Sequence, residues 1–156
     1  KGGDEPAQFL EEPPAEGGRG QLWWLLTGAL AAAVVWPVNS WLARRFGSGA
    51  MVLVAPLLEE CAKTGLAVAA SAPVVLAHAW FGALEGLYEI WREKKVAAGG
   101  MGFISHLLLG VATVEIYRRL QQWPGSVAGA FLLHAGWNGI IFCCCRAKAA
   151  NNIKKE

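Results

Sequence analysis

The feature that most constrains the fold is a series of five apolar runs, each close to the length that a helix needs to cross a membrane. The runs cover residues 22–42, 50–70, 74–91, 101–117 and 127–145. A transmembrane helix needs about 20 residues, with a range of roughly 17–25. Inside a bilayer the backbone must satisfy its own hydrogen bonds, which a helix does within one segment. The pattern therefore predicts an all-α protein, a polytopic transmembrane helix bundle of about five spans in contact with the lipid bilayer.

Composition supports a membrane protein and excludes one function class. The chain is 54% hydrophobic and 17% charged, with a mean hydropathy of +0.35, whereas soluble domains are about one quarter charged. Several of its eight Trp residues, such as Trp23, Trp24 and Trp41, lie at the ends of apolar runs, as in the aromatic belts of membrane proteins. The net charge is only +2 and no basic stripe is interleaved with aromatics, so we expect no nucleic-acid partner.

The chain divides into three parts. Residues 1–20 form a polar arm whose composition predicts disorder, residues 21–146 form the transmembrane helical domain, and residues 147–156 form a basic tail. Helix-breaking residues, mainly Gly and Pro, predict connections between the helices at Gly47-Ser48-Gly49, Ser71-Ala72-Pro73, Gly99-Gly100 and Pro124-Gly125. The chain opens at Lys1 without Met, which favours a processed or partial product, through transit-peptide removal or expression as a fragment.

Basic residues in the connections predict the orientation. Nine lie on one side: Arg44, Arg45, Arg92, Lys94, Lys95, Arg146, Lys148, Lys154 and Lys155. Four lie on the other: Lys1, Arg19, Arg118 and Arg119. The positive side faces the cytoplasm, stroma or matrix. The C-terminus is therefore predicted on the positive side of an organellar inner or thylakoid membrane, or of a bacterial plasma membrane.

The second run carries three charged residues at helical spacing. Lys63 lies four residues after Glu59 and three after Glu60, so it can pair with a carboxylate one turn away. Charges inside spans cost about 2.5–3.5 kcal/mol each on insertion scales, and they usually face the bundle interior. A structural ion pair that merely permits insertion explains one glutamate, but it leaves the second without a neutralising partner.

Three other runs add polar residues to the same interior. His78 and Glu85 lie seven residues apart, hence on one face of a helix, and Gly82 and Gly86 allow close helix packing. Taken alone, His78 is more typical of a core histidine with its hydrogen bonds satisfied than of a functional residue. The remaining candidates are His106, and the pair His134 and Asn138, whose i, i+4 spacing places two donors on one face. Carboxylates, imidazoles and a carboxamide together are suited to activating water and stabilising an oxyanion.

The patterns Glu59-Glu60-x-x-Lys63, Phe81-x-x-x-Glu85 and His134-x-x-x-Asn138 resemble the successive motifs of the PrsW branch of the CPBP family. These are intramembrane proteases that include the CAAX prenyl endopeptidases, and the resemblance covers roughly residues 50–145. It implies a hydrolase in which Glu59 or Glu60 is the general base and Glu85 completes the water or metal site. It further implies that His134 and Asn138 stabilise the tetrahedral intermediate.

The resemblance leaves the cofactor and two supporting roles open. Members of the family have been interpreted both as metalloproteases and as glutamate-dependent enzymes, so a divalent metal such as zinc is one possibility, with Glu60, Glu85 and His134 as candidate ligands. Lys63 and His106 are expected to support the site. The partner would be a membrane-bound protein substrate.

A second hypothesis comes from a different functional class. Many members of the family have seven or eight helices, whereas this chain has five apolar runs. A shortened bundle favours a catalytically inactive, protease-like accessory subunit, with partner subunits in a larger membrane complex. A polar transport path is a third and weaker option. The adjacent Cys143, Cys144 and Cys145 allow either reversible palmitoylation or plain apolar filling.

Overall fold

The computed structural model describes residues 22–47 and 49–153, and within them the chain is all-α, as predicted. The helices are α1 (Trp23–Phe46), α2 (Ala50–Ala69), α3 (Val74–Glu93), α4 (Val96–Leu120) and α5 (Trp123–Ile153). Each corresponds to one of the five predicted apolar runs. The polar arm of residues 1–20 lies outside the described residues, as do residues 154–156. The tail's remaining residues continue α5 as far as Ile153.

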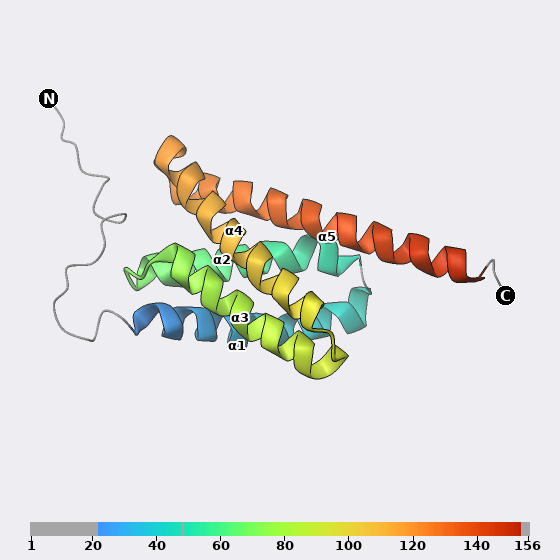
Figure 1. The fold of residues 1–156 in the computed structure, drawn as a ribbon. Helices are drawn as coiled ribbons and strands as arrows, with labels where there is room; N and C mark the ends of the chain where they lie inside the picture. Colours follow the sequence, from blue (N-terminus) through green and yellow to red (C-terminus); the bar gives the residue numbers. More distant parts are fainter. Residues whose placement is uncertain (1–21, 48, 154–156) are drawn as a thin grey trace, which may run out of the picture.

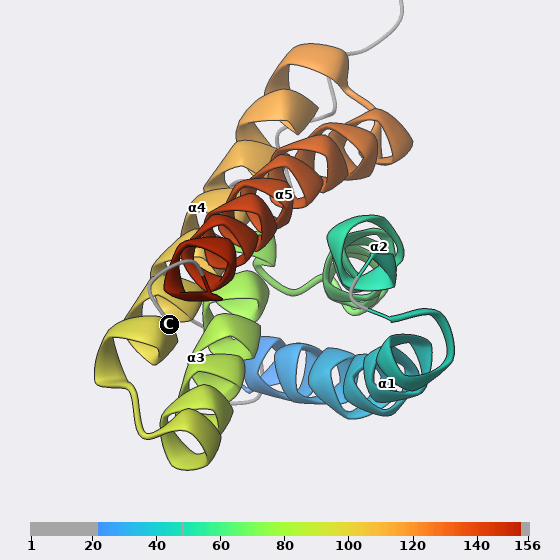
Figure 2. The same ribbon diagram turned by 90° about the vertical axis from the view of Figure 1, so that its right-hand side faces the viewer.

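The five helices form a closed ring. Each packs against two neighbours in the order α1, α2, α5, α4, α3 and back to α1, while α2 also contacts α3 across the ring. The view along the bundle in Figure 2 shows this arrangement. The two residues Lys94 and Lys95 join α3 to α4, and Gln121 and Gln122 join α4 to α5. Such short connections make consecutive helices antiparallel neighbours.

Burial in this ring is the reverse of that in a soluble protein. The fully buried side chains include charged and polar ones such as Glu60, Lys63 and His78. Large apolar side chains instead lie outside, with Val96 72% exposed, Trp91 69% exposed and Leu132 68% exposed. In water such an apolar surface would be costly, whereas in lipid it is the expected exterior.

Within the described residues, three helices are long and apolar enough to cross a membrane: Trp23–Phe46, Val96–Leu120 and the Trp123–Ala147 part of α5. These lengths and compositions make the chain a membrane protein. The helices α2 and α3 are 20 residues long, but they carry most of the buried charges. Whether they also span the bilayer, giving the five predicted spans, stays a prediction.

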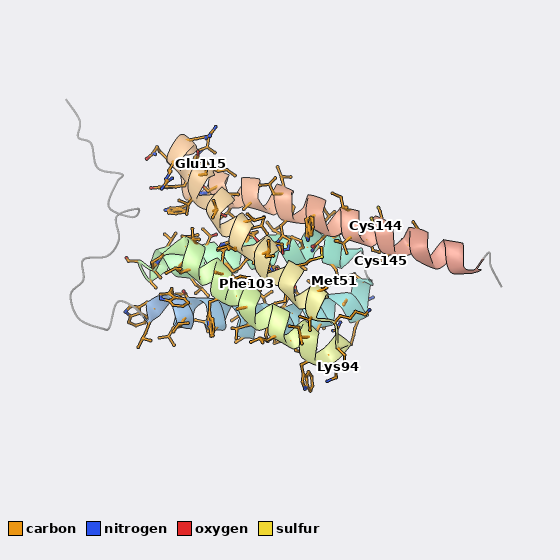
Figure 3. All side chains as sticks on the ribbon, in the orientation of Figure 1. Met51, Lys94, Phe103, Glu115, Cys144 and Cys145 are labelled. Atoms are coloured by element: carbon orange, nitrogen blue, oxygen red, sulfur yellow. The ribbon has the colours of Figure 1, made fainter. Side chains whose placement is uncertain are left out.

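The connections lie alternately at the two ends of the bundle (Figure 1). The α1–α2 and α3–α4 connections share one end with the C-terminal part of α5, which extends past the other helices. Figure 3 shows Lys94 at that end and Glu115 near the opposite one. The fold thus groups the basic connections as the sequence predicts, although the membrane side that each end faces stays a prediction.

Two of the predicted connections are wrong, because their breakers lie inside helices. Gly99 and Gly100 are in the first turns of α4, and Pro124 and Gly125 are in the first turn of α5. Pro is tolerated in a first turn because its missing N–H has no intrahelical partner there. Gly99 serves a packing purpose: a Cβ on Gly86 of α3 would meet the Gly99 carbonyl oxygen at 2.5 Å. The helices α3 and α4 touch here through bare backbone, as small residues in membrane proteins permit.

This contact gives a stability prediction. In a Gly99→Ala variant the new methyl group would meet the Gly86 carbonyl oxygen and lie 2.6 Å from the Ile90 side chain. We expect a loss of about 1–3 kcal/mol in the free energy of unfolding in lipid or detergent, as is typical of overpacking. Gly100→Ala is the matched control, because nothing lies within 4 Å of its Cβ position. Equal stability of the two variants would contradict the packing contact.

Candidate functional site

Four helices contribute ionisable side chains to one buried group at the centre of the ring, which we call the polar cluster. Its members are Glu59, Glu60 and Lys63 of α2, His78 and Glu85 of α3, His106 of α4 and His134 of α5. All are buried except Glu85, whose side chain is 28% exposed. The structure thus brings together the two glutamates, the lysine, Glu85 and two histidines that the sequence singled out.

The α2 helix directs its two adjacent glutamates to different neighbours. Successive residues on a helix point about 100° apart, so Glu59 reaches α1 while Glu60 points to the centre. Asn39 of α1 donates its Nδ2 hydrogen to Glu59 Oε1 at 2.8 Å. Lys63 lies one turn after Glu60 and forms an ion pair with its Oε1 at 2.6 Å, both side chains being fully buried. The two carboxylates therefore have different environments, and Glu60 is the one neutralised directly by a cation.

Lys63 also fixes the hydrogen positions on His106. Its Nζ lies 2.9 Å from His106 Nδ1 and 4.8 Å from the centroid of the Phe81 ring. An ammonium group can only donate, so Nδ1 of His106 accepts and the ring hydrogen lies on Nε2. That Nε2–H donates to Glu85 Oε2. A continuous hydrogen-bonded chain therefore runs from Glu60 through Lys63 and His106 to Glu85.

His134 presents a bare nitrogen to Glu59. Its Nδ1 donates to Glu60 Oε1 at 2.9 Å, and in the neutral imidazole this leaves Nε2 as an acceptor. This Nε2 lies 3.8 Å from Glu59 Oε2, a buried oxygen without a hydrogen-bond partner among the described residues. Two acceptors that face each other require a hydrogen donor between or beside them. A water molecule or a protein N–H or O–H group would meet that need, so this pair is the position in the polar cluster where such a donor would bind.

His78 supports the opposite side of Glu60. Its Nε2 lies 3.2 Å from Thr64 Oγ1, and its Nδ1 lies 3.8 Å from Glu60 Oε2. Gly110 of α4 permits this arrangement, because a Cβ there would come within 2.8 Å of the His78 Cβ. Glu60 is thus surrounded by Lys63, His134 and His78, as befits a carboxylate that holds the cluster together.

Asn138 lies apart from these contacts. It is half-buried, one turn after His134, and its Nδ2 donates to the backbone carbonyl of Met51 at 3.1 Å. One amide hydrogen therefore ties α5 to the start of α2, while the second is not accounted for by this bond. Its implied part in an oxyanion site stays a prediction.

Some donor atoms of the polar cluster lie close enough together to suggest a metal site. Glu59, His106 and His134 each offer one ligand atom, and these atoms lie within 4.8 Å of one another. Of the predicted ligands Glu60, Glu85 and His134, only His134 belongs to this group. Both nitrogens of His106 are already engaged, one of them by the Lys63 ammonium at 2.9 Å. A cation that close would repel a metal ion, so the polar cluster fits a metal poorly.

Sequence reasoning missed two members of this network, Asn39 and Thr64. Asn39 orients Glu59, and Thr64 contacts His78. The signal for Asn39 was present, because it is a strongly polar residue inside the first apolar run and such residues usually face a bundle interior. The sequence signal for Thr64 was weaker, since a threonine hydroxyl can hydrogen-bond a carbonyl of its own helix.

No protein-family model matches the chain, and no curated protein or solved structure matches it. The resemblance to the PrsW branch of the CPBP family therefore stays a prediction, and the function must be argued from the polar cluster itself.

Proposed function

We propose that the chain is an intramembrane endopeptidase of the PrsW type, which hydrolyses a peptide bond of a membrane-bound protein with a glutamate-activated water. One observation carries the proposal: Glu59 Oε2, which has no partner in the described part of the chain, faces Nε2 of His134 across 3.8 Å. A carboxylate beside an acceptor nitrogen in a buried site can hold a water molecule and remove its proton. Glu59 is therefore the general base, in preference to Glu60, which Lys63 neutralises.

The chemistry follows from these positions. The water oxygen bonds to the scissile carbonyl carbon as Glu59 takes one proton, and the carbonyl oxygen gains negative charge. The second Asn138 amide hydrogen, one turn from His134, is the proposed donor to that oxyanion. The C–N bond then breaks and Glu59 returns its proton to the leaving amine. Glu60, Lys63 and His78 hold His134 and His106 in place throughout.

Cleavage of reporter peptides tests both the proposed proteolytic function and the proposed metal-free mechanism. The protein, reconstituted in proteoliposomes, is incubated with single-span reporter peptides, and products are identified by mass spectrometry. We expect specific cleavage that persists after treatment with EDTA or 1,10-phenanthroline, because Lys63 already supplies the cation at the cluster. Loss of cleavage on chelation, with recovery on adding zinc, would overturn the metal-free mechanism while leaving the proteolytic function standing.

A second function is favoured by a different observation. Both nitrogens of His106 and one Asn138 hydrogen are used in internal bonds, as expected of a packing network in an accessory subunit of a membrane complex. That protein would assemble with partner subunits and cleave none of the reporters. Substitutions in the polar cluster would then affect assembly alone, which separates the two functions.

We also propose that the end of the bundle carrying Lys94 and the C-terminus faces the positive side of an organellar inner or thylakoid membrane, or of a bacterial plasma membrane. Support comes from the basic connections grouped at that end. A C-terminal tag in sealed, oriented vesicles should be protected or digested together with a tag in the α3–α4 connection. Opposite behaviour of the two tags would contradict the arrangement.

A further inference from the structure

The polar cluster contains more acid than base. Three carboxyl groups, those of Glu59, Glu60 and Glu85, lie around one ammonium group, that of Lys63. A net negative charge inside a membrane is expensive, so neutrality needs protons on the carboxyl or imidazole groups. Two buried carboxylate oxygens, Glu59 Oε2 and Glu60 Oε2, have no hydrogen-bond partner among the described residues, so each can accept a proton when one is delivered. Such protons must be exchanged with water by some route.

Glu85 is the member of the polar cluster through which such a route can leave. Its side chain is 28% exposed, whereas those of Glu59 and Glu60 are 6% and 0% exposed. It accepts from His106, which is linked through Lys63 to Glu60 and so to His134. The titratable groups that act on Glu85 are Lys63 of α2, His134 of α5, His106 of α4 and Glu59 of α2. Glu85 therefore terminates the hydrogen-bonded chain at its most accessible point.

A second carboxylate continues the line towards the end of the bundle. Glu89 lies one helical turn after Glu85 on the same face of α3, and it is half-buried. Its Oε2 lies 3.6 Å from the position of a Cβ on Gly102 of α4. One turn further, α3 reaches Arg92 and the connection at Lys94, which Figure 3 shows at the end of the bundle. The carboxylates thus lead from the interior to the basic end.

Glycine residues allow α3 and α4 to approach each other closely beside these carboxylates. A Cβ on Gly82 would come within 2.7 Å of the His106 Cβ, and Gly86 contacts the backbone of Gly99. The backbones of α3 and α4 are consequently close enough for His106 of α4 to form a hydrogen bond with Glu85 of α3. Chains of Glu and His side chains inside membranes commonly serve as proton relays.

We propose that Glu89 and Glu85 form the proton-exchange route between the polar cluster and the water at the Lys94 end of the bundle. On release, the proton on His106 Nε2 passes to the Glu85 carboxylate while the Lys63 ammonium gives a proton to His106 Nδ1, and Glu85 then passes its proton to Glu89 and so to water. Uptake runs in reverse: a proton from water reaches Glu89 and then Glu85, Glu85 gives it to Nε2, and Nδ1 returns its proton to the neutral Lys63 amine. Each step moves one proton between an acceptor oxygen or nitrogen and its neighbour, and no oxidant or reductant is involved. The route supplies the site proposed above, but it does not depend on that site being proteolytic.

Infrared spectroscopy of the reconstituted full chain tests the route without any assay of cleavage. Films are transferred from H₂O to D₂O, and the shift of the carboxylic-acid C=O band of protonated carboxyl groups is followed in time. In Glu89→Gln we expect the exchange to slow by about tenfold, the effect on a rate of losing one hydrogen-bonded step. Glu89→Asp should restore part of the rate, because the carboxylate is kept.

Glu115→Gln is the matched control, since this exposed carboxylate lies near the opposite end of α4 and bonds only Arg118 and Arg119 in the contacts described. It should leave the exchange rate unchanged. An exchange rate in Glu89→Gln equal to that of the wild type would overturn the proposed route. So would the absence of any exchangeable carboxylic-acid band in the wild type, because the polar cluster would then hold no such protons. Proteolysis persisting in either case would leave the proposed function intact.

Discussion

Glu59→Gln is expected to reduce reporter cleavage by about 10²–10⁴-fold, the usual contribution of a general base. The glutamine keeps an oxygen that can accept from Asn39, as Glu59 Oε1 does at 2.8 Å. Its new amide group can donate to His134 Nε2, which faces Glu59 Oε2 at 3.8 Å. The variant should therefore fold as well as the wild type while lacking the basic oxygen. Initial rates in proteoliposomes and the unfolding transition of the same preparation measure both properties.

The matched comparison for this prediction is Glu60→Gln. Glu60 bonds Lys63 and His134 directly, so its loss removes the partner of a buried ammonium group and should lower stability as well as activity. Glu115→Gln, an exposed change on α4, should affect neither property. Wild-type cleavage by a well-folded Glu59→Gln variant would show that Glu59 is not the base.

The second large effect is expected on stability. Lys63→Met removes the only cation that contacts Glu60 and His106 in the described network, and it leaves a carboxylate buried without that partner. Breaking a buried ion pair from one side typically costs about 3–5 kcal/mol. We therefore expect an unfolding free energy lower by that amount in detergent titration. The methionine fills a similar volume, so the loss reports charge more than packing.

The double variant Lys63→Met/Glu60→Gln separates the two contributions. Removing both charges should recover much of the stability, because the carboxylate that Lys63 contacts directly is then removed as well. Arg119→Ala is the surface control, since its pair with Glu115 is exposed and such pairs add little. A Lys63→Met variant as stable as the wild type would mean that Lys63 does not hold the polar cluster together.

Much of the architecture was predictable because lipid imposes strong rules on sequence. The five apolar runs became the five helices, and the interior position of Glu59, Glu60, Lys63 and Glu85 followed from the cost of exposing charge to lipid. The exact connections were less predictable. Gly99-Gly100 has the composition of a loop in a soluble protein, yet here both residues lie inside α4, and Gly99 contacts the backbone of Gly86 on α3.

The fine structure of the candidate site could not be derived from spacing. Helical periodicity places Glu59 and Glu60 in the same interior. Only the fold decides that Glu60 pairs with Lys63 and that Glu59 keeps an oxygen without a hydrogen-bond partner among residues 22–47 and 49–153. Asn138 shows the same limit. Its i, i+4 spacing from His134 is real, yet its amide bonds the carbonyl of Met51, 87 residues away in sequence, and no local pattern encodes such a contact.

The most direct test of the central claim is cleavage of a membrane reporter in H₂¹⁸O. If Glu59 activates a water that attacks the scissile carbonyl, mass spectrometry should find ¹⁸O in the newly formed carboxylate of the product. This product should be absent for Glu59→Gln in the same proteoliposomes. A folded wild-type protein that cleaves no membrane reporter, or that yields product with the same isotope content in both waters, would contradict the account, and in the first case the polar cluster would be a packing network.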